Sequence, residues 1–408
     1  MLLKLALKSL LYRRVTVLLT VLSLTISMCL MLGLEHMRVQ AKESFTRTIS
    51  GTDLIVGARS GQLNLLLYSV FRMGNPTNNM SWDSYQRLEQ NKWVDWLVPI
   101  SLGDSFKGYR VVGTTQDYFE RYKFGQKQSL EFAQGEQFEN VLDVVLGAEV
   151  AAKLKLTMGD KITLSHGIGS TSFTNHDEFP FTVVGILAAT GTPVDQAVHV
   201  SLQGIELIHD KPGRHDLTLP LEQLDGLQPK TITATLLGLT SKLGTFQLQR
   251  QINTDKREAM MAIIPGVALT ELWQMLGMVE NLLLFISYMV LGAALVGMCT
   301  MLLASINERV PEINMLRMIG AGPMVIASLI LLEAIAMLLL SILSGLVLLK
   351  LFLIAGQGWL TSEYGLFIST EVMSEGTGYL MLIALICCVF ASILPTITLY
   401  NKALSSRH

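Results

Sequence analysis

Four long runs of apolar residues constrain this chain more than any other feature. Three of them contain no Asp, Glu, Lys or Arg, and the fourth contains only Glu333. The hydrocarbon core of a bilayer is about 30 Å thick, so a helix of about 20 apolar residues can cross it. Each run is therefore long enough to span a membrane. The runs are residues 15–34, 281–307, 320–349 and 376–401.

The first run is preceded by basic residues, as the apolar part of a signal peptide would be. These residues are Lys4, Lys8, Arg13 and Arg14. In a signal peptide, however, the apolar part is about 7–15 residues long and leads to a small-residue cleavage site. The run 15–34 is longer, and no Ala-x-Ala site follows it. We therefore expect an uncleaved membrane helix.

Lys and Arg residues in the short flanking segments predict the orientation of these helices, because such residues are enriched on the cytoplasmic side. In addition to the basic N-terminus, the link between the second and third runs contains Arg309 and Arg317, and the C-terminal tail contains Lys402 and Arg407. By contrast, residues 355–376 contain no Lys or Arg. Both termini and the link are expected in the cytoplasm, and the region between the first two runs is expected on the other side.

The region between the first two runs has the composition of a soluble domain. Short β-rich segments alternate there with segments of helical spacing. Ser81 is expected to cap a helix from Trp82 to Gln90, and a long helix is expected to run from Leu269 into the second membrane run. The predicted strands are residues 53–56, 96–100, 109–112, 144–147, 161–164, 181–187, 198–202 and 231–236.

The sequence lacks three motifs that mark common catalytic sites. A Gly-x-x-x-x-Gly-Lys-Ser/Thr loop, which would cradle the phosphates of ATP, is absent, and so are His-Glu-x-x-His and Gly-x-Ser-x-Gly. The chain has 31 Lys and Arg against 33 Asp and Glu and no basic tract, so a nucleic-acid partner is not expected. We expect no enzymatic activity in this chain, and ATP-driven work would need a separate ATPase subunit.

Six of the seven histidines fall between the first two membrane runs. The densest group combines His166 and His176 with Asp177 and Glu178, but its spacing matches no metal-ligand motif. We expect solvated surface histidines and no metal site, with a zinc-linked role as a minor alternative. The six are His36, His166, His176, His199, His209 and His215.

Glu333 is an ionisable residue in the middle of an apolar run. Such residues are costly in lipid and are often functional. The other runs offer it no charged partner, only the hydroxyls of Ser287, Tyr288, Thr300 and Ser305. A role in helix packing or gating and a role in a transport pathway both remain open.

The link between the second and third runs is the most distinctive segment of the chain. It reads Ser305-Ile-Asn-Glu-Arg-Val-Pro-Glu-Ile-Asn-Met-Leu-Arg-Met-Ile-Gly-Ala-Gly322. Its charged residues alternate with Ile313, Leu316 and Ile319, which are three residues apart and lie near one face of a short helix. Such an amphipathic helix is suited to docking in a groove of a cytoplasmic partner.

This link resembles the signature of the MacB/FtsX superfamily of ATP-binding cassette (ABC) permeases, the mechanotransmission or type VII group. The family pattern is approximately Glu-Arg-x-x-Glu-Ile-x-x-Leu-Arg-x-x-Gly-Ala. The resemblance implies a coupling helix that contacts a separate ATPase subunit. It also implies that ATP and Mg bind to that subunit, so that this chain holds no cofactor of its own. The matching residues are Glu308, Arg309, Glu312, Ile313, Leu316, Arg317, Gly320 and Ala321.

The resemblance continues over nearly the whole chain. Residues 50–56 and 112–119 are similar to stretches of the family's periplasmic domain, and Glu333, Gly345 and Pro395 resemble family residues within the membrane. The implied fold is membrane α plus α/β, with four transmembrane helices and a large mixed α/β periplasmic domain inserted between helices 1 and 2. The expected division is a cytoplasmic N-terminal segment (1–14), transmembrane helix 1 (15–34), the periplasmic MacB-like domain (35–274), transmembrane helix 2 (275–306), the coupling helix (307–320), transmembrane helix 3 (321–354), a periplasmic loop (355–376), transmembrane helix 4 (377–401) and a cytoplasmic tail (402–408).

The resemblance implies a multi-pass permease subunit of the bacterial inner membrane, with both termini in the cytoplasm. The implied partners are a dimer of cytoplasmic ABC ATPase subunits, a second permease copy or homologue, membrane lipid, and a periplasmic or lipoprotein partner. With no fused ATPase, the chain is nearer to LolC/LolE-like or unassigned MacB-like permeases. These export, extract or handle a periplasmic or membrane substrate such as a lipoprotein, peptide or lipid. The alternative is an FtsX-like regulator that relays ATPase motion to a periplasmic enzyme or sensor.

Overall fold

The protein divides into two compact units in the computed structural model. The membrane unit comprises residues 1–40, 276–358 and 368–408, and the α/β unit comprises residues 41–275 and 359–367. The residues that the structure describes are 10–166, 179–209, 228–308, 315, 318, 320–364, 369 and 371–405.

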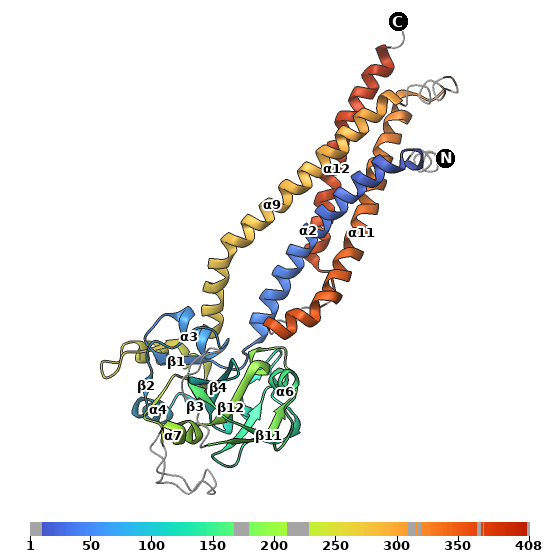
Figure 1. Ribbon diagram of the computed structural model, residues 1–408. Helices are drawn as coiled ribbons and strands as arrows, with labels where there is room; N and C mark the ends of the chain where they lie inside the picture. Colours follow the sequence, from blue (N-terminus) through green and yellow to red (C-terminus); the bar gives the residue numbers. More distant parts are fainter. Residues whose placement is uncertain are drawn as a thin grey trace. The chain divides into compact units, whose positions relative to one another are not determined.

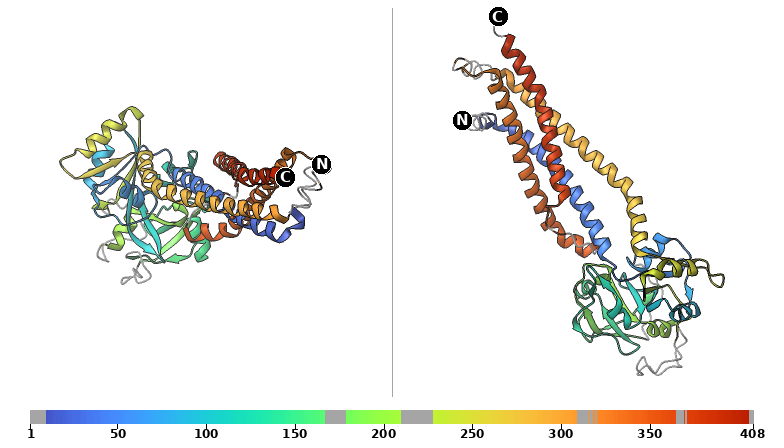
Figure 2. Two further views of the ribbon diagram at one scale, coloured as in Figure 1. Left: turned by 90° about the horizontal axis from the view of Figure 1, so that it is seen from above. Right: turned by 180° about the vertical axis from the view of Figure 1, so that it is seen from behind.

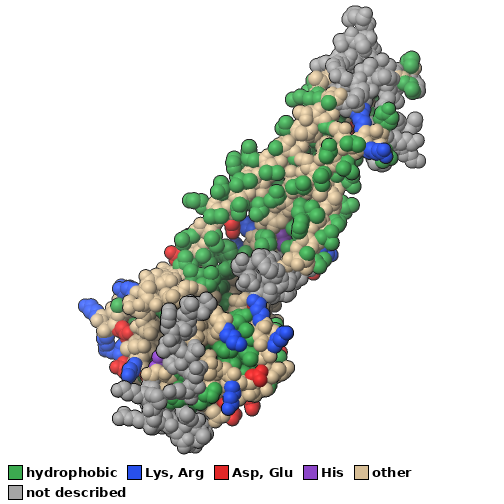
Figure 3. Space-filling view, viewed as in Figure 1, with side chains coloured by type: hydrophobic (Ala, Val, Ile, Leu, Met, Phe, Trp, Pro, Cys, Tyr) green, Lys and Arg blue, Asp and Glu red, His purple; other side chains and the backbone are tan. Residues whose placement is uncertain are grey.

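Four long helices contribute to the membrane unit: α2 (Arg14–Arg47), α9 (Pro265–Glu308), α11 (Pro323–Tyr364) and α12 (Glu375–Ser405) (Figure 1). Figure 2 shows them from two further directions. All four are long and apolar enough to cross a membrane, and apolar side chains cover the face of these helices seen in Figure 3. The prediction of four membrane helices is confirmed.

All four helices continue past their predicted spans, and α2 and α9 lead from the membrane unit into the α/β unit. The boundaries between the units fall between Gln40 and Ala41 in α2 and between Met275 and Leu276 in α9. Neither helix is interrupted at its boundary. The predicted long helix from Leu269 into the second span is therefore confirmed, and it begins one turn earlier, with a proline at its first position, where a missing N–H costs nothing.

An 11-stranded mixed sheet forms the centre of the α/β unit, in the order β15-β1-β14-β3-β4-β12-β8-β11-β7, with β10 beside β3 and β9 beside β11. The pairs β12·β4 and β11·β8 are parallel, and the other pairs are antiparallel. The strands are β1 (Leu54–Ala58), β3 (Val94–Phe106), β4 (Tyr109–Thr114), β7 (Phe132–Gly135), β8 (Asp143–Leu146), β9 (Lys161–Ile162), β10 (Ser165–His166), β11 (Phe181–Leu187), β12 (Ala197–Ser201), β14 (Ala234–Leu239) and β15 (Met260–Ile263).

The long strand β3 joins the two halves of this sheet. Its first half pairs with β14 and its second half pairs with β4. The predicted strands at 53–56, 96–100, 109–112 and 181–187 coincide with β1, β3, β4 and β11. The predicted strand at 231–236 is instead divided between β14 and the short β13 (Thr231–Ile232), which pairs with β2 (Met80–Ser81).

Short helices and one more ribbon complete the unit. Ser81 caps α4 as predicted, because its hydroxyl accepts a hydrogen bond from the Ser84 amide at 3.3 Å. The elements are α3 (Gln62–Ser69), α4 (Trp82–Glu89), α5 (Asp117–Arg121), α6 (Ala148–Leu154), α7 (Leu202–His209), α8 (Thr245–Asn253), the 3₁₀ helices η1 (Pro193–Gln196) and η3 (Lys242–Gly244), and the ribbon of β5 (Lys123–Phe124) and β6 (Gln128–Ser129).

The apolar core of the α/β unit includes the ends of two membrane helices. Leu269 and Leu272 of α9 are buried in its largest cluster, and Phe45 of α2 packs against that cluster. The Phe45 ring centroid lies 5.6 Å from that of Trp273 on α9. Burying a Leu or Phe side chain contributes about 1.5–3 kcal/mol. Apolar burial therefore anchors α2 and α9 in this core.

Candidate functional site

The segment predicted to couple to an ATPase begins where α9 ends, at Glu308. Met315 and Met318 are helical and exposed, and Gly320 follows with a φ of 96°, a conformation that favours glycine. This turn leads into α11. The predicted coupling contacts of Arg309, Glu312, Ile313, Leu316 and Arg317 lie outside the described residues, so they stay predictions.

Gly345 lies where α11 approaches α2 closely. A Cβ atom at this position would lie 3.1 Å from the Cβ of Met28, and 3.4 Å from both the Cys29 nitrogen and the Thr25 carbonyl oxygen. Small residues permit such close approach between membrane helices. The structure therefore gives Gly345, selected from the sequence only by resemblance, a packing role.

Hydroxyl groups add hydrogen bonds to the same contact. The Thr25 and Ser344 hydroxyl oxygens are 2.7 Å apart. The Ser341 hydroxyl lies 2.8 Å from the Met337 carbonyl oxygen of its own helix and 3.2 Å from the Val21 carbonyl oxygen of α2, and its hydrogen is shared between the two acceptors. Hydrogen bonds between membrane helices contribute about 0.6 kcal/mol each on average. Close packing and hydrogen bonding together join α2 to α11.

Pro395 lies inside α12 and alters its hydrogen bonding. A proline has no N–H, so the carbonyl four residues earlier loses its usual helical partner. That carbonyl belongs to Ala391, and it accepts a hydrogen bond from the Cys299 thiol of α9 at 2.7 Å. The proline thus leaves an acceptor on α12 that binds α9, a contact that the sequence alone did not indicate.

Glu333 of α11 is completely buried within the membrane unit. It does not face lipid, in keeping with the high cost of a charge there. Next to it, the carbonyl oxygen of Ala334 accepts from the Cys388 thiol of α12 at 3.6 Å, so α12 packs beside α11 at this level. The sequence offered four hydroxyls as partners for Glu333. Two of them donate within α9: Ser287 to the Leu283 carbonyl and Thr300 to the Gly297 carbonyl.

A second polar group joins α2 to the segment before α12. Glu35 and His36 are both buried. Glu35 forms two hydrogen bonds with the Arg38 guanidinium, at 2.8 and 3.0 Å. The Nε2 atom of His36 lies 2.8 Å from the Ser369 carbonyl oxygen, and the Ser369 amide donates to the Gln40 side chain at 3.1 Å.

The expectation of solvated histidines is wrong for His36 and also for His199, which is completely buried in β12. Its ring centroid lies 5.2 Å from that of Tyr118 and 5.9 Å from that of Phe119. Burial lowers the pKa of His199 to about 3, and the charge of Arg72 acts in the same direction, so the ring is neutral at pH 7. The apolar neighbours Val198 and Val200 were the sequence signal for this burial.

His209 is exposed, with its Nε2 3.9 Å from a carboxylate oxygen of Asp104. His176, Asp177 and Glu178 are not among the described residues, so the densest predicted group is untested. Within the described ranges, no three His, Cys, Asp or Glu side chains come together as a metal site would require.

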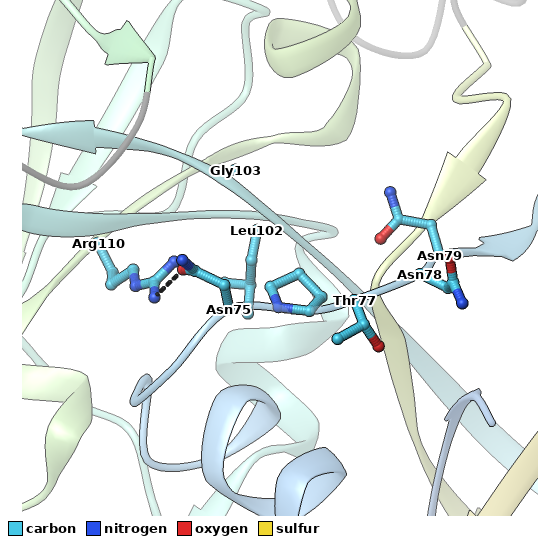
Figure 4. A pocket seen from close by; sticks show the side chains of 8 residues that line it. Asn75, Thr77, Asn78, Asn79, Leu102, Gly103 and Arg110 are labelled. Carbon is cyan, nitrogen blue, oxygen red and sulfur yellow. Dashed lines mark hydrogen bonds between the residues drawn. The ribbon is translucent and has the colours of Figure 1, made fainter. Parts of the chain in front are cut away.

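A polar pocket of about 360 Å³ lies in the α/β unit. We name it the Arg110 pocket. Figure 4 shows the Arg110 guanidinium against the Asn75 side chain at one end, with Asn78 and Asn79 at the other. The sequence signal for Arg110 was a single charge within the apolar strand Tyr109-Arg-Val-Val112. The lining residues are Asn75, Pro76, Thr77, Asn78, Asn79, Leu102, Gly103 and Arg110.

Comparisons with known families match most of the chain. The MacB-like periplasmic core domain matches residues 17–236, which is more than half of the sequence. The FtsX-like permease C-terminal region matches residues 284–404, which include α11, α12 and much of α9.

Among solved structures, the chain is similar to the periplasmic region of MacB from Actinobacillus actinomycetemcomitans. The TM-score is 0.35 and the sequence identity is 10%, over 55% of this chain and 94% of that one. A comparison with curated proteins gave no match.

Proposed function

Because the chain belongs to the MacB/FtsX family of ABC-transporter permeases, we propose that it transmits the motion of a separate ATPase subunit to its own periplasmic α/β unit. Its membrane is the bacterial inner membrane, with both termini in the cytoplasm. ATP and Mg bind to the partner ATPase, not to this chain. The two matched regions and the four membrane helices support this proposal.

The observation that carries the proposal is the continuity of α9. This helix has 44 residues, which corresponds to about 66 Å at 1.5 Å per residue, twice the thickness of a hydrocarbon core. It begins with Leu269 and Leu272 buried in the α/β core and ends at Glu308. A displacement of the link at Glu308 would therefore be passed along one helix into that core.

The contacts inside the membrane unit support the same mechanism. α2, the other helix anchored in the α/β core, is joined to α11 at Gly345 and Ser344. α9 is joined to α12 by the bond from Cys299 to Ala391. Because α11 follows the link and α12 follows α11, movement at the link reaches both anchored helices.

The proposed assembly contains two permeases, this chain with a second copy or a homologue, and two ATPase subunits. The proposed substrate is a lipoprotein, peptide or lipid that is handled at the periplasmic side. The FtsX-like regulator remains the second candidate, since the matched C-terminal region is FtsX-like. Cross-linking of periplasmic partners separates the two: a hydrolase or a sensor supports the regulator, and a lipoprotein or an efflux adaptor supports transport.

Charge reversal at the end of α9 tests the proposal. In a double variant with Glu308→Arg and Arg309→Glu, we expect ATPase activity in the purified complex to lose its stimulation by the permease, because the coupling surface no longer fits its groove. The matched control reverses the exposed pair Glu43 and Arg47 of α2 in the same way and should leave stimulation unchanged. Full stimulation in the Glu308–Arg309 variant would overturn the proposal.

A further inference from the structure

The Arg110 pocket has a buried cation in its wall. The Arg110 side chain comes from β4, and only 9% of the residue is exposed. Its Nη2 atom donates to the Gly74 carbonyl oxygen and, at 2.8 Å, to the Asn75 side-chain oxygen. Both acceptors are neutral. The guanidinium is thus held in place without a counter-charge from either partner.

Arg110 forms no ion pair with an acidic side chain within 4.0 Å among the described residues. Burial lowers the pKa of Arg110, and the neighbouring charge of Arg72 lowers it further. A buried charge is normally paired, because desolvation without compensation is costly. An anion in the pocket would supply the missing compensation.

The geometry leaves donors available for such an anion. A guanidinium has five N–H donors, and only Nη2 of Arg110 bonds to residues that the structure describes. Toward the far end of the pocket, Thr77 and Asn78 are exposed and add hydroxyl and amide donors. None of the described residues that line the pocket carries a carboxylate that would compete for these donors.

We propose that the Arg110 pocket binds the phosphate group of a small polar ligand. The phosphate lies against the Arg110 guanidinium, which matches phosphate geometry, and the polar remainder of the ligand lies toward Thr77 and Asn78. The volume of about 360 Å³ is in the range of small-molecule sites. A purely structural role for Arg110, holding the chain at Gly74 and Asn75, would occupy only its Nη2 atom.

Titration calorimetry of the full chain in neutral detergent tests this site, with glycerol phosphate as the probe and chloride at equal ionic strength as the reference. We expect saturable binding to the wild type and none to Arg110→Met. Because that variant removes a buried side chain, a second variant is needed. Asn78→Asp adds a negative charge at an exposed position of the pocket and should weaken binding about two- to fivefold.

The matched control is Gln247→Glu, which makes the same amide-to-acid change at an exposed position of α8 outside the pocket. It should bind glycerol phosphate as the wild type does. The proposal is overturned if neither glycerol phosphate nor a short-chain phosphatidylglycerol binds saturably to the wild type, or if Arg110→Met and Asn78→Asp bind as well as the wild type.

The same experiment separates the two sources of such a phosphate, a free solute and a lipid headgroup. Dihexanoyl phosphatidylglycerol carries the same glycerol phosphate group, here as a diester with a glycerol that bears two short acyl chains. Binding at least tenfold tighter than that of glycerol phosphate supports a lipid headgroup as the ligand. Binding equal to or weaker than that of glycerol phosphate supports a free solute.

Discussion

The membrane unit exposes many of its large apolar side chains, whereas the α/β unit buries most of its own. In the membrane unit, Phe285 and Phe352 face outward while Ser341 is buried. In the α/β unit, Phe138 and Phe181 are buried. Water drives apolar side chains together, but lipid is as apolar as those side chains, so membrane helices associate through close approach and hydrogen bonds. Different substitutions should therefore destabilise the two units.

Overpacking the contact between α2 and α11 should have the largest effect. Gly345→Leu places a side chain where even a Cβ would meet Met28 and Thr25 at 3.1–3.4 Å. We expect a loss of about 1–3 kcal/mol of stability, seen as a lower midpoint of thermal unfolding in detergent. The control is Gly297→Leu in α9, where nothing lies within 4 Å. Equal midpoints for the two variants would refute the packing role of Gly345.

The buried His199 should make the α/β unit sensitive to acid. Its pKa of about 3 in the fold is below the ordinary value of about 6.5 in an unfolded chain. Between these values the unfolded chain binds more protons, so stability is present above pH 6.5 and is lost as the pH falls. At pH 5 the expected loss is about 2 kcal/mol relative to pH 8, at 1.36 kcal/mol per pH unit. Urea unfolding of the full chain, followed by tryptophan fluorescence, measures it.

Two variants sharpen this second test. His199→Phe keeps an aromatic ring beside Tyr118 and Phe119 but cannot titrate, so this part of the pH dependence should disappear. His209→Gln removes an exposed histidine and should retain the wild-type dependence. A wild-type slope in His199→Phe would mean that another group causes the acid sensitivity.

The long helices were predictable because an apolar run of membrane length can form few structures other than a membrane-spanning helix. The helix from Leu269 and the cap at Ser81 followed from local spacing and capping chemistry, and both are confirmed. The individual strands could also be predicted, because they are β-rich segments of the sequence. Their order could not, because neighbours in the sheet are far apart in sequence; Val98 of β3, for example, pairs with Leu236 of β14.

The candidate sites were less predictable, because burial depends on the neighbours that the fold supplies. Gly345 and Pro395 were selected by resemblance, but the contacts that explain them involve Met28 on α2 and Cys299 on α9. Arg110 became a candidate only once the fold placed it beside Asn75 with no acidic partner among the described residues.

The continuity of α9 is the central claim, and one helix-breaking substitution tests it. Nothing lies within 4 Å of a Cβ placed at Gly277, so a side chain fits there, and Gly277→Pro breaks the helix through its missing N–H and its ring. The measurement is hydrogen exchange of the α/β unit in the complex with its ATPase, with and without a non-hydrolysable ATP analogue. In the wild type and in the control Gly277→Ala, nucleotide should change this exchange. In Gly277→Pro the change should vanish while nucleotide still binds; an unchanged response would contradict the account.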